Sequence, residues 1–257
     1  LVMADRAREA YNALDAEFKT IARIQQCLLP ASLPKANGID LASYYATAHR
    51  AGGDYYDVFP LDNQRSGILI ADVSGHGAAA AVVMARMHAS LHSGAANMDS
   101  PAEVLSFAND HLLLQCRADS EVTTFVTSFY AVFDPADSSL LYASAGHNPP
   151  RLRRADGCMC SIAGARSWPL GIQCGVQYEQ DRLMLGRDDH LLLYTDGIVE
   201  ATNTAGDQFG VDRLDRAVLQ PHDCARTMVG NVVTAVDRFT QDTPALDDRT
   251  LLALRVR

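Results

Sequence analysis

The sequence lacks an excess of basic residues, since its 22 lysines and arginines face 31 acidic residues and the net charge is -9. Because nucleic-acid binding usually needs a basic face, this balance argues against a nucleic-acid partner and favours the uptake of cations. No apolar run approaches the roughly 20 residues of a membrane-spanning helix, and no basic segment followed by an apolar one opens the chain. We therefore expect no membrane segment in this part of the protein.

Paired cysteines and nucleophile motifs are also missing. The six cysteines do not show the C-x-x-C spacing of zinc sites, so we interpret them as reduced thiols and expect a cytoplasmic protein. The chain has no G-x-S-x-G motif and no G-x-x-x-x-G-K-S/T phosphate loop, and Ser74 has no identifiable histidine and acid partner. Metal-activated water is the better candidate nucleophile.

The chain of 257 residues is long enough for one large domain, and no repeat or low-complexity linker divides residues 35–257. Because it begins with Leu1 rather than Met, we expect it to be part of a longer protein. We divide it into an N-terminal linker helix, residues 1–33, and a folded domain, residues 34–257. Adjacent strand-like runs joined by short turns, with helices in pairs, favour an α+β domain with largely antiparallel sheets.

The N-terminal segment has the periodicity of a long amphipathic helix. Less polar residues recur in alternating steps of three and four between Ala4 and Leu28, as at the a and d positions of a heptad repeat, and only Gln25 in this series is polar. Such a helix can pair with a copy of itself, which makes residues 4–28 a candidate homodimer interface. Alternatively, it lies on its own domain. In a longer protein it would connect the domain to an upstream sensor domain.

Apolar runs and turn residues predict the remaining elements. We expect strands at residues 41–45 and 55–61 to form a hairpin, and a third strand at residues 67–73. The other predicted elements are helices at 78–91, 104–115, 212–219 and 223–239, and strands at 123–133, 140–145, 151–154, 159–162, 183–185, 190–194 and 250–256.

Four acidic residues stand at the ends of apolar runs. Asp54 follows two glycines, whose lack of a Cβ lets an ion or a phosphate approach the backbone. Asp72 and Asp196 each end an apolar run and Asp247 precedes another. Singly, an aspartate beside a glycine is more often a turn former, but several at one buried edge would repel one another unless cations neutralised them. All-oxygen ligation favours Mg²⁺ or Mn²⁺, and two such ions would activate a water for attack on phosphorus.

Six stretches of the chain then show a family resemblance. They are IQQCLLP (24–30), GGDYYD (52–57), ADVSGHG (71–77), AGHNPP (145–150), YTDG (194–197) and DDRT (247–250). In this order they resemble the SpoIIE/RsbU-type branch of the PP2C (PPM) metal-dependent serine/threonine phosphatases, over roughly residues 20–257. The resemblance implies that residues 34–257 form a four-layer αββα sandwich of two mainly antiparallel sheets flanked by helices. A two-metal centre would lie in the cleft between the sheets.

The resemblance also implies ligand roles for the acids. Asp54 would bridge two ions, either Mn²⁺ or Mg²⁺. Asp72 would bind on one side together with the backbone carbonyl of Val73. Asp196 and Asp247 would bind on the other side.

Other residues of these motifs are candidates for supporting roles. They are Gly53, Asp57, His76, Gly197 and Asp248. We expect Asp57 to orient waters around the ions. His76 is a candidate catalytic acid or, alternatively, part of a turn that starts the next helix. Asp248 either supports the ligands or, if the register shifts by one residue, is itself a ligand.

The resulting hypothesis is a metal-dependent protein phosphatase that hydrolyses phosphoserine or phosphothreonine. By resemblance, its substrate would be a regulatory protein, typically a STAS-type anti-anti-sigma factor. One alternative is a catalytically silent module that binds a STAS partner. Another is a nucleotide cyclase, because Gly-Gly-Asp-Tyr-Tyr is similar to the GGDEF signature. The chain lacks the Glu-Phe of that signature, and the later acidic motifs have no place in such an enzyme.

Overall fold

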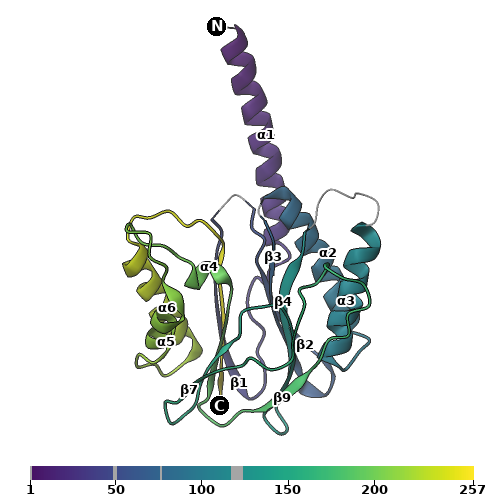
Figure 1. Ribbon diagram of the computed structural model, residues 1–257, viewed down its shortest axis with the longest axis vertical. Coiled ribbons are helices and arrows are strands. Elements are labelled where there is room, and N and C mark those ends of the chain that lie inside the picture. Colours follow the sequence, from purple (N-terminus) through teal and green to yellow (C-terminus); the bar gives the residue numbers. More distant parts are fainter. Residues whose placement is uncertain (1, 49–50, 76, 117–123) are drawn as a thin grey trace.

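The structure, a computed structural model, describes residues 2–48, 51–75, 77–116 and 124–257. A long helix, α1 (Val2–Gln26), projects from one end of a sandwich of two sheets, and the C-terminus lies at the opposite end (Figure 1). None of the helices in the described ranges is long and apolar enough to cross a membrane.

The first sheet joins the two ends of the domain, and we call it the β11 sheet. Its strands lie in the order β1 (Ile39–Ala46), β11 (Arg249–Val256), β10 (His190–Tyr194), β6 (Arg151–Arg153) and β7 (Met159–Ser161). All of its neighbouring strands are antiparallel. The last strand of the chain therefore lies inside the sheet, between β1 and β10.

The second sheet is the β3 sheet. Its strands lie in the order β2 (Tyr55–Pro60), β3 (Ser66–Val73), β4 (Val126–Asp134), β5 (Ser139–Ala145) and β8 (Arg166–Ser167), and β9 (Asp181–Met184) also pairs with β5. The predicted hairpin of the first two strands is wrong, because β1 pairs with β11 whereas β2 pairs with β3. The segment between β1 and β2 crosses from one sheet to the other.

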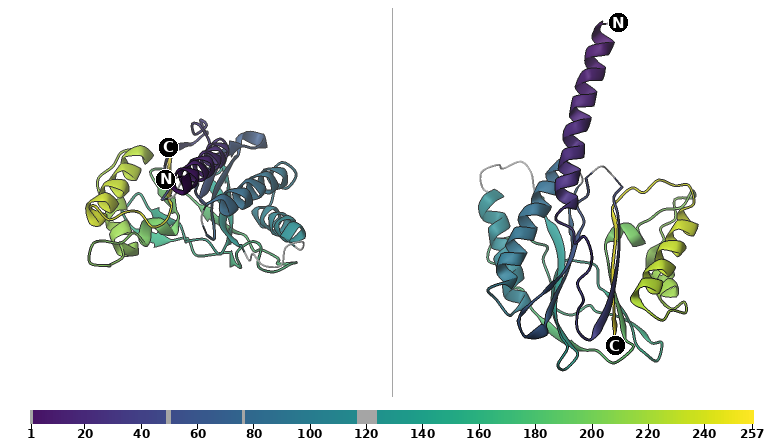
Figure 2. Two further views of the ribbon diagram at one scale, coloured as in Figure 1. Left: turned by 90° about the horizontal axis from the view of Figure 1, so that it is seen from above. Right: turned by 180° about the vertical axis from the view of Figure 1, so that it is seen from behind.

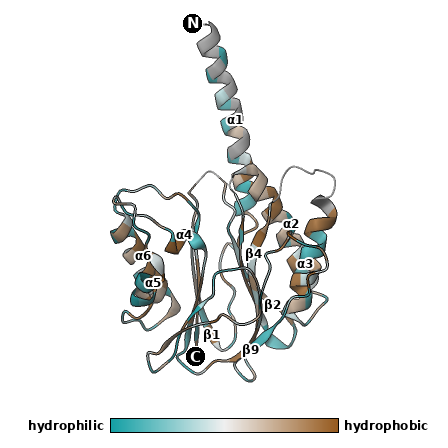
Figure 3. Cartoon of the chain, viewed as in Figure 1, coloured by the Kyte–Doolittle hydropathy of each residue, from teal (hydrophilic) through white to brown (hydrophobic). Residues whose placement is uncertain are grey.

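Helices cover the outer face of each sheet. The helices α2 (Ala78–Ala95) and α3 (Pro101–Cys116) pack on the β3 sheet, and α4 (Asp196–Val199), α5 (Gly210–Val218) and α6 (Ala225–Thr240) pack on the β11 sheet. A short 3-10 turn, η1 (Asp62–Gln64), connects β2 to β3. Seen from above, the two helical layers lie on opposite sides of the sheets (Figure 2). In Figure 3, hydrophobic residues occur along both α2 and α3, and on α3 they alternate with hydrophilic ones.

Successive residues of the central strands point into different cores. In β3, Leu69 packs toward α2 and α3, and Ile70 packs between the sheets. In β10, Leu192 packs toward α5 and α6, and Leu193 packs between the sheets. Because both faces of each sheet are buried, these strands are continuous apolar runs in the sequence. The predicted α+β sandwich of four layers, helices on sheet on sheet on helices, is confirmed.

The C-terminal turns of α1 pack on the domain, and its N-terminal part projects from it. Ile21 and Ala22 pack with Ala51 and the start of α2, and Gln25 is 2% exposed. Farther out, Tyr11 is 63% exposed. The helix lies on its own domain over its last turns only. Several side chains of the heptad series lie outside those that the structure describes, namely Ala4, Ala7, Leu14 and Phe18.

Candidate metal centre

The four predicted acids stand at one edge of the sandwich, near the end of α1. Asp54 directly precedes β2, and Asp72 lies at the end of β3. Asp196 follows β10 as the first residue of α4, and Asp247 lies just before β11. Because β2 and β3 are antiparallel, the start of one and the end of the other share an edge, and the same holds for β10 and β11. Each sheet thus contributes two acids.

Burial and neighbouring charges raise the pKa of three of these carboxyl groups. Burial, followed by the charges of Asp196 and Asp247, raises the pKa of Asp72 to about 7. Burial and the charge of Asp247 raise the pKa of Asp196 to about 6. Burial and the charge of Asp72 raise the pKa of Asp54 well above its usual range. Cation binding would displace these protons and relieve the repulsion.

Asp54 is held between the sheets by two threonines. Its carboxyl group is 2% exposed, and its Oδ2 accepts hydrogen bonds from Thr195 Oγ1 at 2.7 Å and from Thr250 Oγ1 at 2.5 Å. The Thr250 N–H donates to Thr195 Oγ1 at 3.0 Å. Both threonines belong to the β11 sheet side, so they tie the loop before β2 to the opposite sheet. Neither threonine was predicted to have a role, although each stands within three residues of a predicted ligand.

Asp248 fixes the loop that carries Asp54. It is 5% exposed, its Oδ1 accepts the Ala48 N–H at 2.8 Å, and its Oδ2 accepts the Gly53 N–H at 2.7 Å. Its neighbour Asp247 is exposed, and its charge acts on the other acids. Since both oxygens of Asp248 are engaged by backbone amides, the geometry favours the supporting role over that of a ligand.

Two glycines of the motifs allow close backbone approaches. A Cβ on Gly53 would lie 2.7 Å from the carbonyl oxygen of Val73, so a side chain there would fill the space that this oxygen faces. A Cβ on Gly197 would overlap the carbonyl oxygen of Asp248. Glycine at these positions lets neighbouring strand ends within each sheet approach one another closely.

The residues present fit hard divalent cations. The donors are carboxylate oxygens and one carbonyl, which Mg²⁺ and Mn²⁺ prefer, and the glycine at position 53 leaves room beside that carbonyl. Among the described residues, no three of these acids bring ligand atoms within 4.8 Å of one another. An ion here would therefore keep several waters, as Mg²⁺ usually does.

One predicted residue, Asp57, is not part of this group. Asp57 lies on the opposite face of β2, where its Oδ2 accepts a hydrogen bond from Tyr55 Oη at 2.9 Å. Residues alternate along the strand, so Tyr55 and Asp57 face α2, whereas Tyr56 faces the core between the sheets. His76 lies outside the described residues.

A residue of α1 contacts the loop of the acids. Gln25 Oε1 accepts the Gly52 N–H at 3.1 Å, and Gln25 Nε2 donates to Tyr45 Oη at 2.8 Å. Sequence analysis did not assign Gln25 to the site. Its polarity in an otherwise apolar heptad series could have indicated such a contact, because a buried polar side chain needs hydrogen-bond partners.

Comparison with known proteins agrees with this architecture. The family described as Stage II sporulation protein E (SpoIIE) matches residues 62–257. The chain is 30% identical to the phosphoserine phosphatase RsbU of Bacillus subtilis over 246 residues, which covers 94% of this chain and 70% of RsbU. The chain belongs to the SpoIIE family.

One further relative and one solved structure are also similar to this chain. The phosphoserine phosphatase RsbP of Bacillus subtilis is 31% identical over 164 residues, which is 64% of this chain and only 40% of RsbP. The solved SiaA-PP2C domain of Pseudomonas aeruginosa superposes with a TM-score of 0.80 at 18% identity, covering 96% of this chain and 99% of that domain. The SpoIIE-family domain described here therefore has the PP2C phosphatase fold.

Proposed function

We propose that this domain is a protein serine/threonine phosphatase that depends on Mn²⁺ or Mg²⁺. Two ions would be held by Asp54 between them, by Asp72 with the Val73 carbonyl on one side, and by Asp196 and Asp247 on the other. When bound, the ions activate a water for attack on phosphorus and neutralise charge on the phosphoryl oxygens. The observation that carries the proposal is that acids from two sheets meet at one edge, where burial and neighbouring carboxylates raise the pKa of Asp54, Asp72 and Asp196.

The chain's own residues prepare this site before a substrate arrives. The hydroxyls of Thr195 and Thr250 orient the Asp54 carboxylate between the sheets. Asp248 fixes the Gly53 amide next to it and adds negative charge that favours cations. Because these contacts cross from one sheet to the other, the site depends on the packing of the whole sandwich. Preorganisation of this kind lowers the cost of ordering ligands around the ions.

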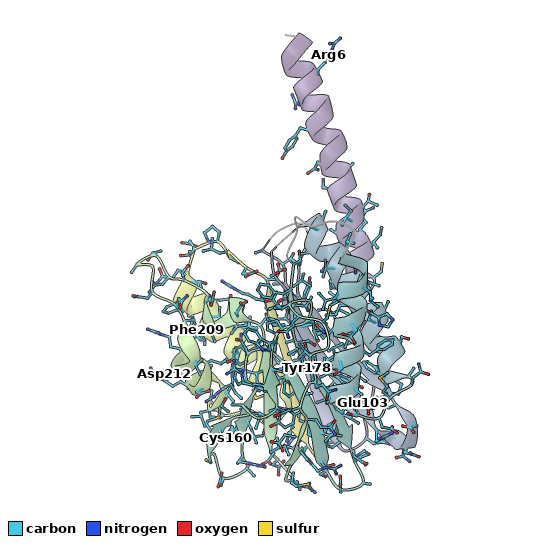
Figure 4. All side chains as sticks on the ribbon, turned by 45° about the vertical axis from the view of Figure 1, so that its right-hand side comes forward. Arg6, Glu103, Cys160, Tyr178, Phe209 and Asp212 are labelled. Carbon is cyan, nitrogen blue, oxygen red and sulfur yellow. The ribbon has the colours of Figure 1, made fainter. Side chains whose placement is uncertain are left out.

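The test is phosphate release from a phosphoserine protein in Mn²⁺, with Asp72→Asn and Asp196→Asn as variants. We expect both variants to lose activity and Mn²⁺ binding by calorimetry while remaining folded. Asp212→Asn is the matched control, because Asp212 is an exposed acid of α5 outside the group of four (Figure 4). Full activity in either ligand variant would contradict the metal assignment. Tight binding of the phosphoprotein by a wild type that neither binds Mn²⁺ nor releases phosphate would favour the silent module.

We also propose that the substrate is a phosphorylated STAS-type protein. The relatives RsbU and RsbP are named phosphoserine phosphatases, which supports phosphoserine as the group that is cleaved. The chain spans 40% of RsbP and 70% of RsbU, so further parts of a longer protein would contribute to partner choice. The measurement is the ratio of kcat/KM for a folded phospho-STAS protein to that for a short phosphopeptide of the same sequence. Equal values would show that the STAS fold is not recognised.

We propose that α1 transmits a signal from an upstream sensor domain, with residues 4–28 pairing in a homodimer. Its outer part projects from the domain with Tyr11 exposed, and its inner end reaches the acid-bearing loop through Gln25. Sedimentation at several protein concentrations tests the pairing. A Tyr11→Lys variant, which places like charges opposite each other in a pair, should shift the equilibrium toward monomer. The pairing would be refuted if the wild type stayed monomeric at all concentrations.

A further inference from the structure

A second group of ligand-type side chains lies on the outer face of the β3 sheet, away from the four acids. Tyr55 and Asp57 stand two residues apart on β2 and both face α2. His88 and His92 stand four residues apart on α2, so they lie on the same side of that helix. The two imidazoles, the carboxylate and the phenol converge from two elements that are packed against each other.

The distances within this group are those of a ligand cluster. His92 Nε2 lies 2.8 Å from Asp57 Oδ2. Tyr55 Oη lies 2.6 Å from His88 Nδ1, 2.9 Å from Asp57 Oδ2 and 3.3 Å from His92 Nε2. Among the described residues, Asp57, His88 and His92 are the one trio of such side chains whose ligand atoms all lie within 4.8 Å of one another.

We propose that Asp57, His88 and His92 form a binding site for a borderline transition-metal ion such as Zn²⁺. Two imidazole nitrogens and one carboxylate oxygen are a donor set that suits zinc, whereas Mg²⁺ and Mn²⁺ prefer oxygen alone. Three protein ligands leave a fourth position open for water. The proposal does not depend on the proposed phosphatase activity, because it concerns different residues on the other face of β2.

The surroundings of the cluster hold its ligands in place. The second oxygen of Asp57, Oδ1, accepts the Val58 N–H at 2.7 Å, which fixes the carboxylate. The two imidazole rings lie 4.4 Å apart between centroids, and the Phe59 ring lies 4.4 Å from that of His92. The His92 side chain is 33% exposed, which gives an ion a way in from solvent.

Without a metal, the same groups satisfy one another through protons. The Tyr55 hydroxyl donates to Asp57 Oδ2, and each imidazole has an oxygen of the cluster within hydrogen-bonding distance. An ion would take the place of these hydrogen bonds, and the ring proton of each neutral imidazole would then lie on the nitrogen that faces away from the ion. The bound ion would link β2 to α2. The first of these elements starts next to Asp54, and the second follows the motif that contains Asp72. Zn²⁺ should therefore stabilise the packing of the two segments that lead from the acids.

The test is calorimetric titration of the metal-stripped chain with Zn²⁺ in the presence of excess Mg²⁺, which competes for the all-oxygen centre. We expect one equivalent of Zn²⁺ to bind the wild type and the affinity of His92→Gln to fall by at least ~10-fold. His111→Gln on α3 is the matched control, since His111 lies on a different helix from the cluster and its Nδ1 is 3.0 Å from the Phe107 carbonyl. Equal affinity in the wild type and His92→Gln, or no saturable binding at all, would overturn the proposal.

X-ray absorption on the Zn²⁺-loaded wild type tests the ligands without any substitution. Scattering from two imidazole rings in a nitrogen and oxygen shell is the expected result. A sulfur shell at about 2.3 Å would assign the ion to cysteines. A shell of oxygen alone would assign it to the four acids at the other face of β2. Either outcome would refute the proposed site. Zn²⁺ should also raise the Tm of the wild type more than that of His92→Gln, because an ion stabilises the native state in proportion to how tightly it binds there.

Discussion

The hydrogen bond from Thr250 to Asp54 allows a quantitative test of the metal centre. Valine has nearly the shape of threonine, so Thr250→Val removes the 2.5 Å bond to the buried carboxyl group and leaves the backbone pairing of β11 intact. Without metal, burial and the charge of Asp72 raise the pKa of Asp54 and so favour its protonated form, to which the lost bond is a neutral one. A neutral hydrogen bond contributes about 1 kcal/mol.

With Mn²⁺ bound, Asp54 would be ionised and the same bond would be charge-assisted. Such bonds contribute about 1.5–3 kcal/mol, so Thr250→Val should reduce the free energy of unfolding by about 0.5–2 kcal/mol more in Mn²⁺ than without it. By linkage, Mn²⁺ should bind the variant roughly 2- to 30-fold more weakly.

Urea unfolding in EDTA and in saturating Mn²⁺ gives the two free energies, and calorimetric titration with Mn²⁺ gives the affinity independently. Thr20→Val is the control, because the Thr20 hydroxyl bonds the Ala16 carbonyl at 2.9 Å on the exposed face of α1. It should change neither quantity by more than a few tenths of a kcal/mol. If Thr250→Val were equally destabilising in both conditions and Mn²⁺ affinity did not change, Asp54 would not be a ligand.

Three further predictions concern the loop of the acids and its charge. Gly52→Ala should lower the free energy of unfolding in urea by roughly 2–4 kcal/mol, because its Cβ would overlap the carboxylate of Asp248 that fixes this loop. The control Gly230→Ala, in open space on α6, should raise that free energy by up to about 1 kcal/mol. Similar effects of the two substitutions would contradict the expected overlap. Gln25→Leu should lower the free energy of unfolding by about 1–3 kcal/mol and speed hydrogen exchange of the Gly52 amide, because that buried amide loses its acceptor. The control Gln26→Leu, at an exposed position, should have neither effect. In EDTA the contribution of Asp72 to the free energy of unfolding, measured as the difference between the wild type and Asp72→Asn, should fall by roughly 2 kcal/mol, after allowance for solvent screening, as pH rises from about 4 to 7. In that window Asp72 ionises in the unfolded chain, whereas in the folded protein burial and nearby carboxylates raise its pKa to about 7 and favour the protonated form. Asp72→Asn should therefore flatten the dependence of the free energy of unfolding on pH. An unchanged dependence would argue against the clustering of these carboxylates.

Local patterns predicted most elements because they depend on neighbours in sequence. Alternation and apolar runs follow from strand geometry, so β3 and β10 were found close to their observed bounds. The four-residue α4 was missed, since so short a helix has no periodicity to detect. The acids at strand ends were found for the same local reason, together with their resemblance to SpoIIE-family motifs.

Pairing and side-chain direction were not available from such patterns. The hairpin of the first two strands was expected because they are neighbours, but the partner of β1 is the last strand of the chain. Asp57 was expected to orient waters around the ions because it belongs to the same GGDYYD motif as Asp54. Its direction depends on the twofold alternation of β2, which places it against α2.

The sequence by itself determined the composition of the site, because glycines and carboxylates at the ends of apolar runs are a local requirement of close backbone approach and cation binding. Only the tertiary structure decided how the acids are held. Thr195 and Thr250 reach Asp54 across the two sheets, and Gln25 reaches the same loop from α1. These contacts join residues far apart in the chain, and burial makes each of them costly to break. The hydrophobic periodicity of the sequence does not predict these contacts, because they form only when both sheets have packed.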